Sequence, residues 1–293
     1  MNNAHQIKMR SWLFAPGDSE KKMGKAIASD ADIALLDLED SVVPERKEAA
    51  REMVAQAIRS TPDPARVWVR VNPLSGNWTK GDLDAVVSAG PGGVFLPKAE
   101  GGQDVETLDA MLTEREQAAG LAVGSIKVAA LVTETAAAMF TTGTYDGAPR
   151  LVAMSWGAED LSSEIGASQQ RGPDGEYTHV FEMARSLCLL GAVKAGVIPL
   201  ETVQPEFRDL EALETRARRV RAQGFRGMLA IHPAQVAPIN AAFTPSAEEI
   251  AHARAIVDAF AANPEAGALQ LDGAMIDRPH LALAQRLLAE AGE

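Results

Sequence analysis

The chain has 293 residues, a formal net charge of −12 at pH 7 and 46% hydrophobic residues. This length fits two small domains or one α/β barrel with an extension, and the composition is that of a globular protein with a sizeable core. The acidic balance argues against a nucleic-acid partner, which needs a basic face, and no apolar run approaches the roughly 18–20 residues of a membrane span.

The first residues, MNNAHQIKMRSW, lack the apolar stretch of a signal peptide. The single cysteine, Cys188, excludes an internal disulfide framework, and its apolar setting in SLCLLGAV indicates a small core residue. We therefore expect a cytoplasmic protein with no membrane partner. In so acidic a chain, an anionic ligand must be met by a local cluster of Lys and Arg.

Apolar strand-like segments recur along the chain and are separated by amphipathic, helix-like ones. The strand candidates are residues 11–17, 32–40, 67–73, 93–99, 127–135, 151–160, 197–203 and 227–233. Helical spacing is clear in residues 44–58, with Pro44 in the first turn, and in residues 207–224, which end at Gly224. Eight such units close a (β/α)8 barrel, and a doubly wound sheet with an extra lobe is the competing architecture.

The residues after the eighth strand are not needed to close a barrel. We predict a barrel domain over residues 1–244 and a helical extension over residues 245–293, with a helix over 245–264. The Pro- and Gly-containing segment 262–269 is typical of a hinge. Residues 278–292 then form an amphipathic helix with apolar residues that need a surface to cover.

Polar residues gather at the ends of the predicted strands, which is the face that carries chemistry in this barrel. They are Asp18, Asp37, Glu39, Asp40, Arg70, Asn72, Lys98, Glu134, Glu159, Asp160, Glu201 and His232. Clustered carboxylates that follow a buried strand are costly to desolvate unless a cation lies nearby.

Glu134 and Asp160 follow adjacent strands and could share one metal ion. Oxygen-only ligands favour Mg²⁺ or Mn²⁺, and neither the five histidines nor the lone cysteine gives a zinc-type set. The competing interpretation is that these acids form structural salt bridges with Arg70 and Lys98. Arg70 is also a natural counter-charge for an oxyanion or a carboxylate substrate, and the simpler role for it is to neutralise Asp37 and Glu39.

Three other functional motifs are not matched by the sequence: a phosphate-binding loop, a nucleophile elbow and a dinucleotide-binding fingerprint. The segment PGDSEKKMGK has the wrong spacing for a phosphate-binding loop, but it leaves a lysine cluster, with Arg10 close by in sequence, suited to a phosphorylated ligand. Ser155 lacks the first glycine of a nucleophile elbow, and there is no dinucleotide-binding glycine fingerprint.

Several segments together resemble the citrate lyase beta subunit-like family, which includes malyl-CoA and citramalyl-CoA lyases of the pyruvate/phosphoenolpyruvate barrel superfamily. They are RSWLFAPG, LLDLEDSVVPERKEAAR, VRVNP, VFLPKAE, TETA, SWGAEDLSSEIGA, FRGMLAIHPAQVAPINAAFTPS and LDGAMIDRPH. The match runs in order from about residue 10 to the C-terminus. It implies Mg²⁺-dependent cleavage or formation of a carbon–carbon bond beside a CoA thioester, with Mn²⁺ as a possible substitute.

The resemblance also implies a role for each matching residue. Glu134 and Asp160 would hold the metal, and Arg70 would stabilise the enolate oxygen. Glu39 and Asp40 would line the site and support Arg70. The CoA would be held by Phe14, Lys22, Lys25, Ile231, His232 and Pro233. Asp277 would be the acid/base, which in relatives is donated by a neighbouring subunit, so that a homo-oligomer (a trimer or a hexamer) is expected.

The implied reaction cleaves a 3-hydroxyacyl-CoA, such as malyl-CoA or citramalyl-CoA, to acetyl-CoA and a 2-keto acid. Three rival functions are a beta subunit that works only inside a citrate lyase assembly, a CoA-independent metal aldolase, and a catalytically silent binding protein. One residue departs from the family's pattern: Glu201 stands where Asp is usual. We expect its extra methylene to narrow the pocket.

Overall fold

The computed structural model describes residues 8–173 and 175–292. The chain divides between Asn240 and Ala241 into two compact units, which are described separately below as the barrel unit and the C-terminal unit. The sequence prediction placed the domain boundary after residue 244. Among the described residues, no helix is long and apolar enough to cross a membrane.

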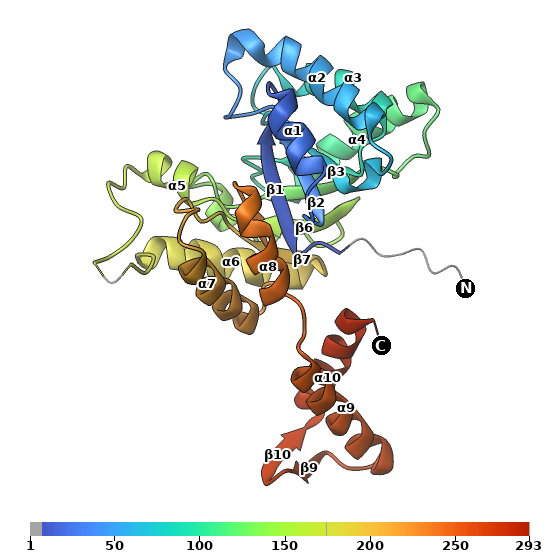
Figure 1. Ribbon diagram of the computed structural model, residues 1–293, viewed down its shortest axis with the longest axis vertical. Helices are drawn as coiled ribbons and strands as arrows, with labels where there is room; N and C mark the ends of the chain where they lie inside the picture. Colours follow the sequence, from blue (N-terminus) through green and yellow to red (C-terminus); the bar gives the residue numbers. More distant parts are fainter. Residues whose placement is uncertain (1–7, 174, 293) are drawn as a thin grey trace. The chain divides into compact units, whose positions relative to one another are not determined.

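The barrel unit is a closed ring of eight parallel strands in chain order, surrounded by helices (Figure 1). The strands are β1 (Ser11–Pro16), β2 (Ile33–Asp37), β3 (Val67–Arg70), β4 (Gly93–Leu96), β5 (Lys127–Leu131), β6 (Leu151–Ser155), β7 (Ile198–Glu201) and β8 (Gly227–Ala230). Each lies within one of the eight predicted segments. The (β/α)8 prediction is confirmed, and the doubly wound alternative is wrong because β8 pairs with β1 and closes the sheet.

The core of the barrel follows from the two-residue alternation of its strands, in which every second side chain points inward. Buried inward residues include Trp12, Leu35, Trp68 and Leu200, and the rings of Trp12 and Trp68 lie 4.8 Å apart edge to face. Two residues beyond Leu35, the same alternation brings Asp37 to the inward side at the end of its strand. It does the same for Arg70, two residues beyond Trp68.

Helices cover the outside of the ring. They are α1 (Glu20–Ile27), α2 (Lys47–Ser60), α3 (Thr79–Val86), α4 (Gly102–Ala119), α5 (Ala158–Ile165), α6 (His179–Ala195), α7 (Leu210–Gln223) and α8 (Val236–Ala242). Short 3₁₀ helices are η1 (Pro44–Arg46), η2 (Pro64–Arg66), η3 (Val87–Ala89), η4 (Ala138–Phe140) and η5 (Pro233–Gln235). The connection from β5 to β6, which is described throughout, carries η4 instead of an α-helix, whereas two helices follow β6.

The ends of α7 show how local sequence sets a helix boundary. The Asp209 carboxylate accepts a hydrogen bond from the backbone N–H of Ala212 at 3.0 Å, which satisfies one of the unpaired donors of the first turn. Gly224 ends the helix at φ 115°, in the left-handed region that glycine adopts without strain. The predicted stop at Gly224 is confirmed.

The C-terminal unit consists of α9 (Ala247–Ala262), an antiparallel hairpin of β9 (Ala268–Leu271) and β10 (Ala274–Asp277), and α10 (Arg278–Ala291). The two predicted helices are present, but the hairpin was not predicted. Its two-residue turn is Asp272–Gly273, with both residues at positive φ, and Asp-Gly is a strong sequence signal for such a turn.

The apolar face of α10 is covered within the C-terminal unit. Ile256 and Phe260 of α9 form a buried cluster with Ala284, and Leu281, Leu287 and Leu288 of α10 pack against it. The expected hinge at residues 262–269 is wrong, because this segment joins α9 to β9 inside the unit. Arg278 also donates a hydrogen bond to the Pro264 carbonyl oxygen at 2.6 Å, which ties the segment to α10.

Candidate active site

Arg70 lies at the carboxyl end of β3 and is held by two acids from the neighbouring strand and loop. Its Nε and Nη2 donate to Oδ1 and Oδ2 of Asp37 at 2.7 and 2.8 Å, and its Nη1 lies 3.0 Å from Oε2 of Glu39. The Phe14 ring lies 4.9 Å from the Arg70 guanidinium carbon. These contacts agree with the interpretation that Arg70 neutralises Asp37 and Glu39. The Nε–Nη2 edge of the Arg70 guanidinium group is occupied by Asp37.

These contacts keep both Arg70 and Asp37 in their charged forms. Burial favours the neutral form of both side chains, but the opposite charges and the hydrogen bonds between them outweigh it. The pKa of Arg70 is raised above its ordinary value, and that of Asp37 is lowered. Arg70 is thus a fixed cation at the mouth of the barrel.

Lys98, which follows β4, connects three of the predicted acids. Its ammonium lies 2.6 Å from Oε1 of Glu39, 3.1 Å from Oδ1 of Asp160 and 3.9 Å from Oδ2 of Asp40. Although burial disfavours its charge, the hydrogen bond to Glu39 and the surrounding carboxylates raise the pKa of Lys98 above its usual value. The ammonium thus links the loop after β2 to the first turn of α5.

Within the part of the chain that the structure describes, the buried Glu134 carboxylate forms no ion pair with a Lys or Arg side chain, unlike the other acids of this group. Its Oε2 accepts a hydrogen bond from the backbone N–H of Lys98 at 2.6 Å, and 3% of the residue is exposed. Burial, with added repulsion from Glu39 and Asp160, raises the pKa of Glu134 to about 8. Gly157 makes room for this side chain, because a Cβ there would lie 2.8 Å from Glu134 Cγ.

This environment fits a divalent cation. Five acids, Asp37, Glu39, Asp40, Glu134 and Asp160, gather here, and the cationic side chains that form ion pairs with them among the residues that the structure describes are Arg70 and Lys98. In the described part of the chain, no group of three or more His, Cys, Asp or Glu side chains is arranged as a metal cage. Two carboxylates with open positions are what Mg²⁺ commonly uses, since it keeps several waters and binds substrate oxygens.

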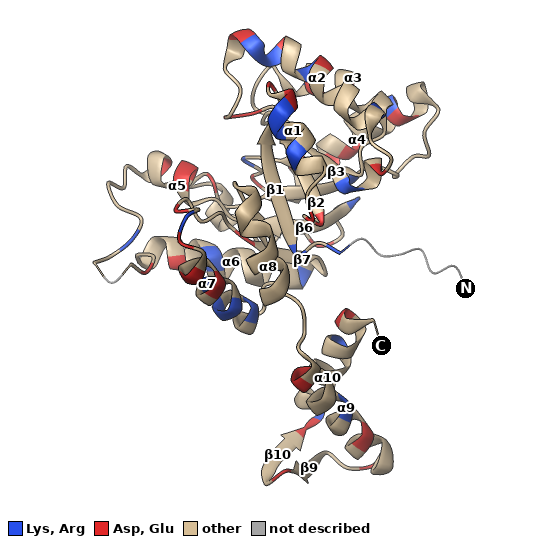
Figure 2. Ribbon diagram, viewed as in Figure 1, with Lys and Arg blue, Asp and Glu red and all other residues tan. Residues whose placement is uncertain are grey.

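The lysines predicted to meet a phosphorylated ligand lie on α1, which follows β1 (Figure 2). Lys22 and Lys25 are both exposed. Arg10 does not join them: it forms an ion pair with Asp32 at 2.8 Å, just before the start of β2, at the opposite end of the barrel. Arg10 is therefore close to these lysines in sequence but does not join them in the structure.

Residues Ile231, His232 and Pro233 form an exposed segment directly after β8. The buried Gln235 side chain organises it, since its Oε1 accepts hydrogen bonds from the N–H groups of Ile231 and His232 at 2.8 and 3.1 Å. The His232 ring stacks on Phe207 with ring centres 4.7 Å apart. The segment thus presents a preformed surface on the same face as the acids.

Glu201 does not narrow the mouth of the barrel. Leu200 points inward, so the next residue points outward, and the Glu201 carboxylate pairs with Arg216 of α7 at 2.5 Å. The residue is fully buried between β7 and α7. The expectation that its extra methylene narrows the substrate pocket is wrong.

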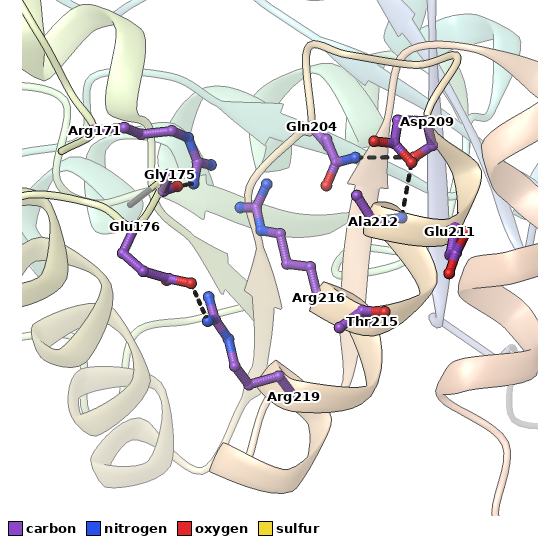
Figure 3. Close-up of a pocket in the computed structure, with 10 residues that line it drawn as sticks. All are labelled: Arg171, Gly175, Glu176, Gln204, Asp209, Glu211, Ala212, Thr215, Arg216 and Arg219. Carbon is purple, nitrogen blue, oxygen red and sulfur yellow. Dashed lines mark hydrogen bonds and ion pairs between the residues drawn. The ribbon is translucent and has the colours of Figure 1, made fainter. Parts of the chain in front are cut away.

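A pocket of about 470 Å³ opens beside this pair, between α7 and the segment that precedes α6 (Figure 3). Its lining includes Arg216, Gln204 and an Arg219–Glu176 ion pair at 2.5 Å. None of the predicted site residues lines it. The pocket is therefore distinct from the cluster of acids.

Asp277 lies in the C-terminal unit, at the start of α10. Its carboxylate accepts a hydrogen bond from the backbone N–H of His280 at 3.5 Å and lies 2.5 Å from His280 Nδ1. The His280 hydrogen bond lowers the pKa of Asp277. The carboxylate therefore caps α10 and remains partly exposed.

Sequence reasoning missed a buried polar network behind the acids. Lys47 of α2 donates to the carbonyl oxygens of Leu38 and Glu39 at 2.8 and 3.0 Å and to Asn72 Oδ1 at 2.8 Å. The Asn72 amide in turn donates to Asp82 at 2.7 Å. In sequence Lys47 looks like one of several surface charges in ERKEAAR, and only its burial reveals the role.

The chain matches the HpcH/HpaI aldolase/citrate lyase family over residues 10–233. The citrate lyase subunit beta-like protein of Mycobacterium tuberculosis is 37% identical over 283 residues, which cover 96% of this chain and 95% of that protein. The (3S)-malyl-CoA thioesterase of Cereibacter sphaeroides is 32% identical over 292 residues, which cover 98% of this chain and 96% of that protein.

A solved structure agrees with these sequence matches. Protein CitE from Mycobacterium tuberculosis, in complex with magnesium, acetoacetate and coenzyme A, aligns with a TM-score of 0.79 and 36% identity. The alignment covers 98% of this chain and 99% of that chain. The prediction of an enzyme of the citrate lyase beta-like type is confirmed, and the chain belongs to the HpcH/HpaI aldolase/citrate lyase family.

Proposed function

We propose that this protein is a Mg²⁺-dependent lyase that cleaves, or forms, a 3-hydroxyacyl-CoA thioester of the malyl-CoA or citramalyl-CoA type. The products of cleavage are acetyl-CoA and a 2-keto acid. The observation that carries the proposal is a connected set of charged groups: Arg70, a fixed cation, pairs with Asp37 and Glu39. Lys98 joins Glu39 to Asp160 and, through its backbone N–H, to Glu134, and these two acids have oxygen ligands for a divalent cation. The magnesium and coenzyme A named with CitE support the same ligands here.

Glu134 and Asp160 would hold Mg²⁺ or Mn²⁺. When bound, the ion acts as a Lewis acid on the hydroxyl and carboxylate oxygens of the substrate. Arg70 would donate to the thioester oxygen, where negative charge develops as the carbon–carbon bond breaks. Asp37 occupies the Nε and Nη2 edge of the fork, and Nη1 lies 3.0 Å from Glu39. The donors left for the thioester oxygen are therefore the second N–H of Nη2 and the N–H of Nη1 that does not face Glu39.

The remaining steps move two protons. As the bond between C2 and C3 breaks, its electrons pass to the thioester enolate, and the hydroxyl passes its proton to solvent water as the carbonyl forms. Asp277 would then protonate the enolate carbon, which gives acetyl-CoA; in the condensation direction it would remove that proton. Glu39 and Asp40 would line the site, and Glu39 would hold Arg70 and Lys98 in place.

The CoA would lie across the exposed face of the barrel. Lys22 and Lys25 of α1 suit its phosphates, and the segment Ile231, His232 and Pro233 offers exposed apolar and aromatic surface. Phe14 would contribute from inside the barrel, next to Arg70. We further propose a homo-oligomer, such as a homotrimer, in which Asp277 serves a neighbouring site.

The relative from Cereibacter sphaeroides favours a second candidate activity, hydrolysis of a malyl-CoA-type thioester. Both activities require the same thioester but release different products. A lyase gives a 2-keto acid and acetyl-CoA, whereas a thioesterase gives free CoA and the intact hydroxy acid.

The test is a panel of 3-hydroxyacyl-CoA thioesters incubated with the purified protein and Mg²⁺. The keto acid would be detected as its hydrazone and free CoA by a thiol reagent. We expect keto acid in equal amount to acetyl-CoA. Free CoA without keto acid would replace the lyase assignment by the thioesterase.

Two controls test the citrate lyase subunit and the CoA-independent aldolase. Activity of the isolated homo-oligomer on soluble CoA thioesters excludes an obligatory citrate lyase assembly. Stabilisation against thermal unfolding by CoA alone, which a ligand of the native state must produce, excludes an aldolase that acts only on free hydroxy-keto acids. Turnover of free hydroxy-keto acids with no effect of CoA would contradict the proposal.

A further inference from the structure

Lys98 has an unusual backbone conformation for its residue type. Its φ is 51°, in the left-handed region that residues other than glycine rarely adopt. Strained residues of this kind persist only where the surroundings hold them, and they gather at functional sites. Here the surroundings are the acids of the candidate active site.

This conformation directs two different groups of Lys98 to two different acids. The backbone N–H donates to Glu134 Oε2 at 2.6 Å, and the ammonium lies 3.1 Å from Asp160 Oδ1. The ammonium is itself held by Glu39 at 2.6 Å. One residue thus contacts both acids that are proposed as metal ligands.

We infer that Lys98 is a positioning residue that sets the orientation of Asp160 and Glu134 for the divalent cation. The inference rests on the proposed function, since it requires these two acids to be the ligands. Groups that orient metal ligands through hydrogen bonds commonly change metal affinity by about 10- to 100-fold when they are removed.

The sign of the effect distinguishes this role from a simpler one. By charge alone, a lysine cation so close to Asp160 repels a divalent cation, and its removal strengthens metal binding. If Lys98 orients Asp160, its removal weakens metal binding despite the lost repulsion. The two roles therefore predict opposite changes in affinity.

The experiment is calorimetric titration of the full-length protein with Mn²⁺, in the wild type and in Lys98→Gln, Lys98→Gly and Lys98→Arg. We expect the Gln and Gly variants to bind Mn²⁺ about 10- to 100-fold more weakly. The Arg variant, which keeps a donor and the charge, should recover part of the loss. Gly accepts a positive φ without strain, so thermal unfolding of Lys98→Gly checks that weaker binding is not a folding defect.

Lys127→Gln is the matched control. Lys127 is an exposed lysine at the start of β5, at the other end of the barrel, and it donates to the Gly124 carbonyl oxygen at 2.9 Å. Its removal changes the net charge equally, so unchanged Mn²⁺ affinity there shows that the effect at Lys98 is local.

Steady-state kinetics distinguish a positioning role of Lys98 from direct participation in the reaction. In Lys98→Gln, we expect the Mg²⁺ concentration for half-maximal rate to rise about as much as the Mn²⁺ dissociation constant, with most of kcat restored at saturating Mg²⁺. Mn²⁺ binding to Lys98→Gln that is equal to or tighter than wild type would overturn the inference and leave Lys98 as a counter-charge. Wild-type protein that binds no Mn²⁺ would overturn the metal assignment, and the inference with it.

Discussion

At the scale of single residues, the site is a chain of alternating charges. It runs from Asp37 through Arg70, Glu39 and Lys98 to Asp160, with successive charged atoms 2.6–3.1 Å apart. A buried charge is tolerated when it is paired, and in this chain each inner member touches two opposite charges. This explains how Asp37 and Glu39 can be buried at the end of β2 without destabilising it.

Arg70→Lys tests the fork geometry, because lysine keeps the charge but offers one compact donor group. We expect kcat to fall about 10²- to 10³-fold, as for the loss of one oxyanion donor. The measurement is steady-state kinetics with the best thioester of the panel. A raised KM with unchanged kcat would instead assign Arg70 to uniform substrate binding.

Asp160→Asn tests the metal site, since the amide keeps the shape but loses the charge that attracts a divalent cation. We expect loss of activity together with loss of thermal stabilisation by Mg²⁺. Glu159→Gln is the control, because Glu159 is an exposed neighbour in the same first turn of α5. Full turnover of the wild type in excess EDTA would refute the assignment.

At the scale of elements, the two ends of the barrel carry different polar networks. Away from the candidate site, the buried Glu116 at the end of α4 accepts hydrogen bonds from the N–H groups of Gly124 and Ile126 at 2.8 and 2.9 Å. Arg150, just before β6, donates to the same carboxylate at 2.8 Å. This network ties α4 to the starts of β5 and β6, and the end of the barrel on which it lies is the one that serves stability.

Glu116→Gln should reduce stability in a pH-dependent way. Burial acts to raise the pKa of Glu116, but the backbone N–H groups and Arg150 lower it below its usual value. Its contribution is therefore fully present above about pH 4.5 and is lost as pH falls through the folded-state pKa. We expect the variant to be less stable than wild type by about 3 kcal/mol at pH 7.

The measurement is urea unfolding of both proteins from pH 7 down to pH 3, where the difference should shrink. Glu114→Gln is the control, since this carboxylate is exposed and lies 3.7 Å from Arg115. A difference that stays constant over the pH range would show that shape and not charge is responsible.

At the scale of the whole molecule, the question is which site Asp277 serves. The apolar face of α10 was expected to need a surface to cover, and α9 provides that surface within the C-terminal unit, so this face gives no argument for docking on a neighbour. What remains is that the barrel closes with its own eight strands, and that the family resemblance implies an acid/base from a neighbouring subunit. Action in trans therefore stays a prediction.

Complementation tests this prediction. Asp160→Asn and Asp277→Asn are each expected to be inactive, and they would be co-assembled in one oligomer. If Asp277 acts across subunits, some interfaces bring an intact metal site to an intact Asp277, and partial activity returns. Mixed oligomers that form but remain inactive would show that Asp277 serves its own subunit.

The sequence by itself determined the barrel and the residues of its catalytic face. Eight apolar segments that alternate with amphipathic helices are the number that closes a (β/α)8 barrel, and the polar residues at their carboxyl ends then meet at one mouth. Asp37, Arg70, Glu39 and Lys98 were all identified in this way. The Asp272–Gly273 turn was also readable, although the hairpin was not predicted.

Only the tertiary structure decided which of these residues touch. Lys98 and Glu39 are 59 positions apart, and their 2.6 Å contact depends on the packing of two loops. Glu201 turned outward to Arg216, and Lys47 turned out to be a buried donor behind the acids. Spacing along a strand fixes its two faces, but the partner of a long charged side chain is chosen by three-dimensional packing and by the need to pair each buried charge.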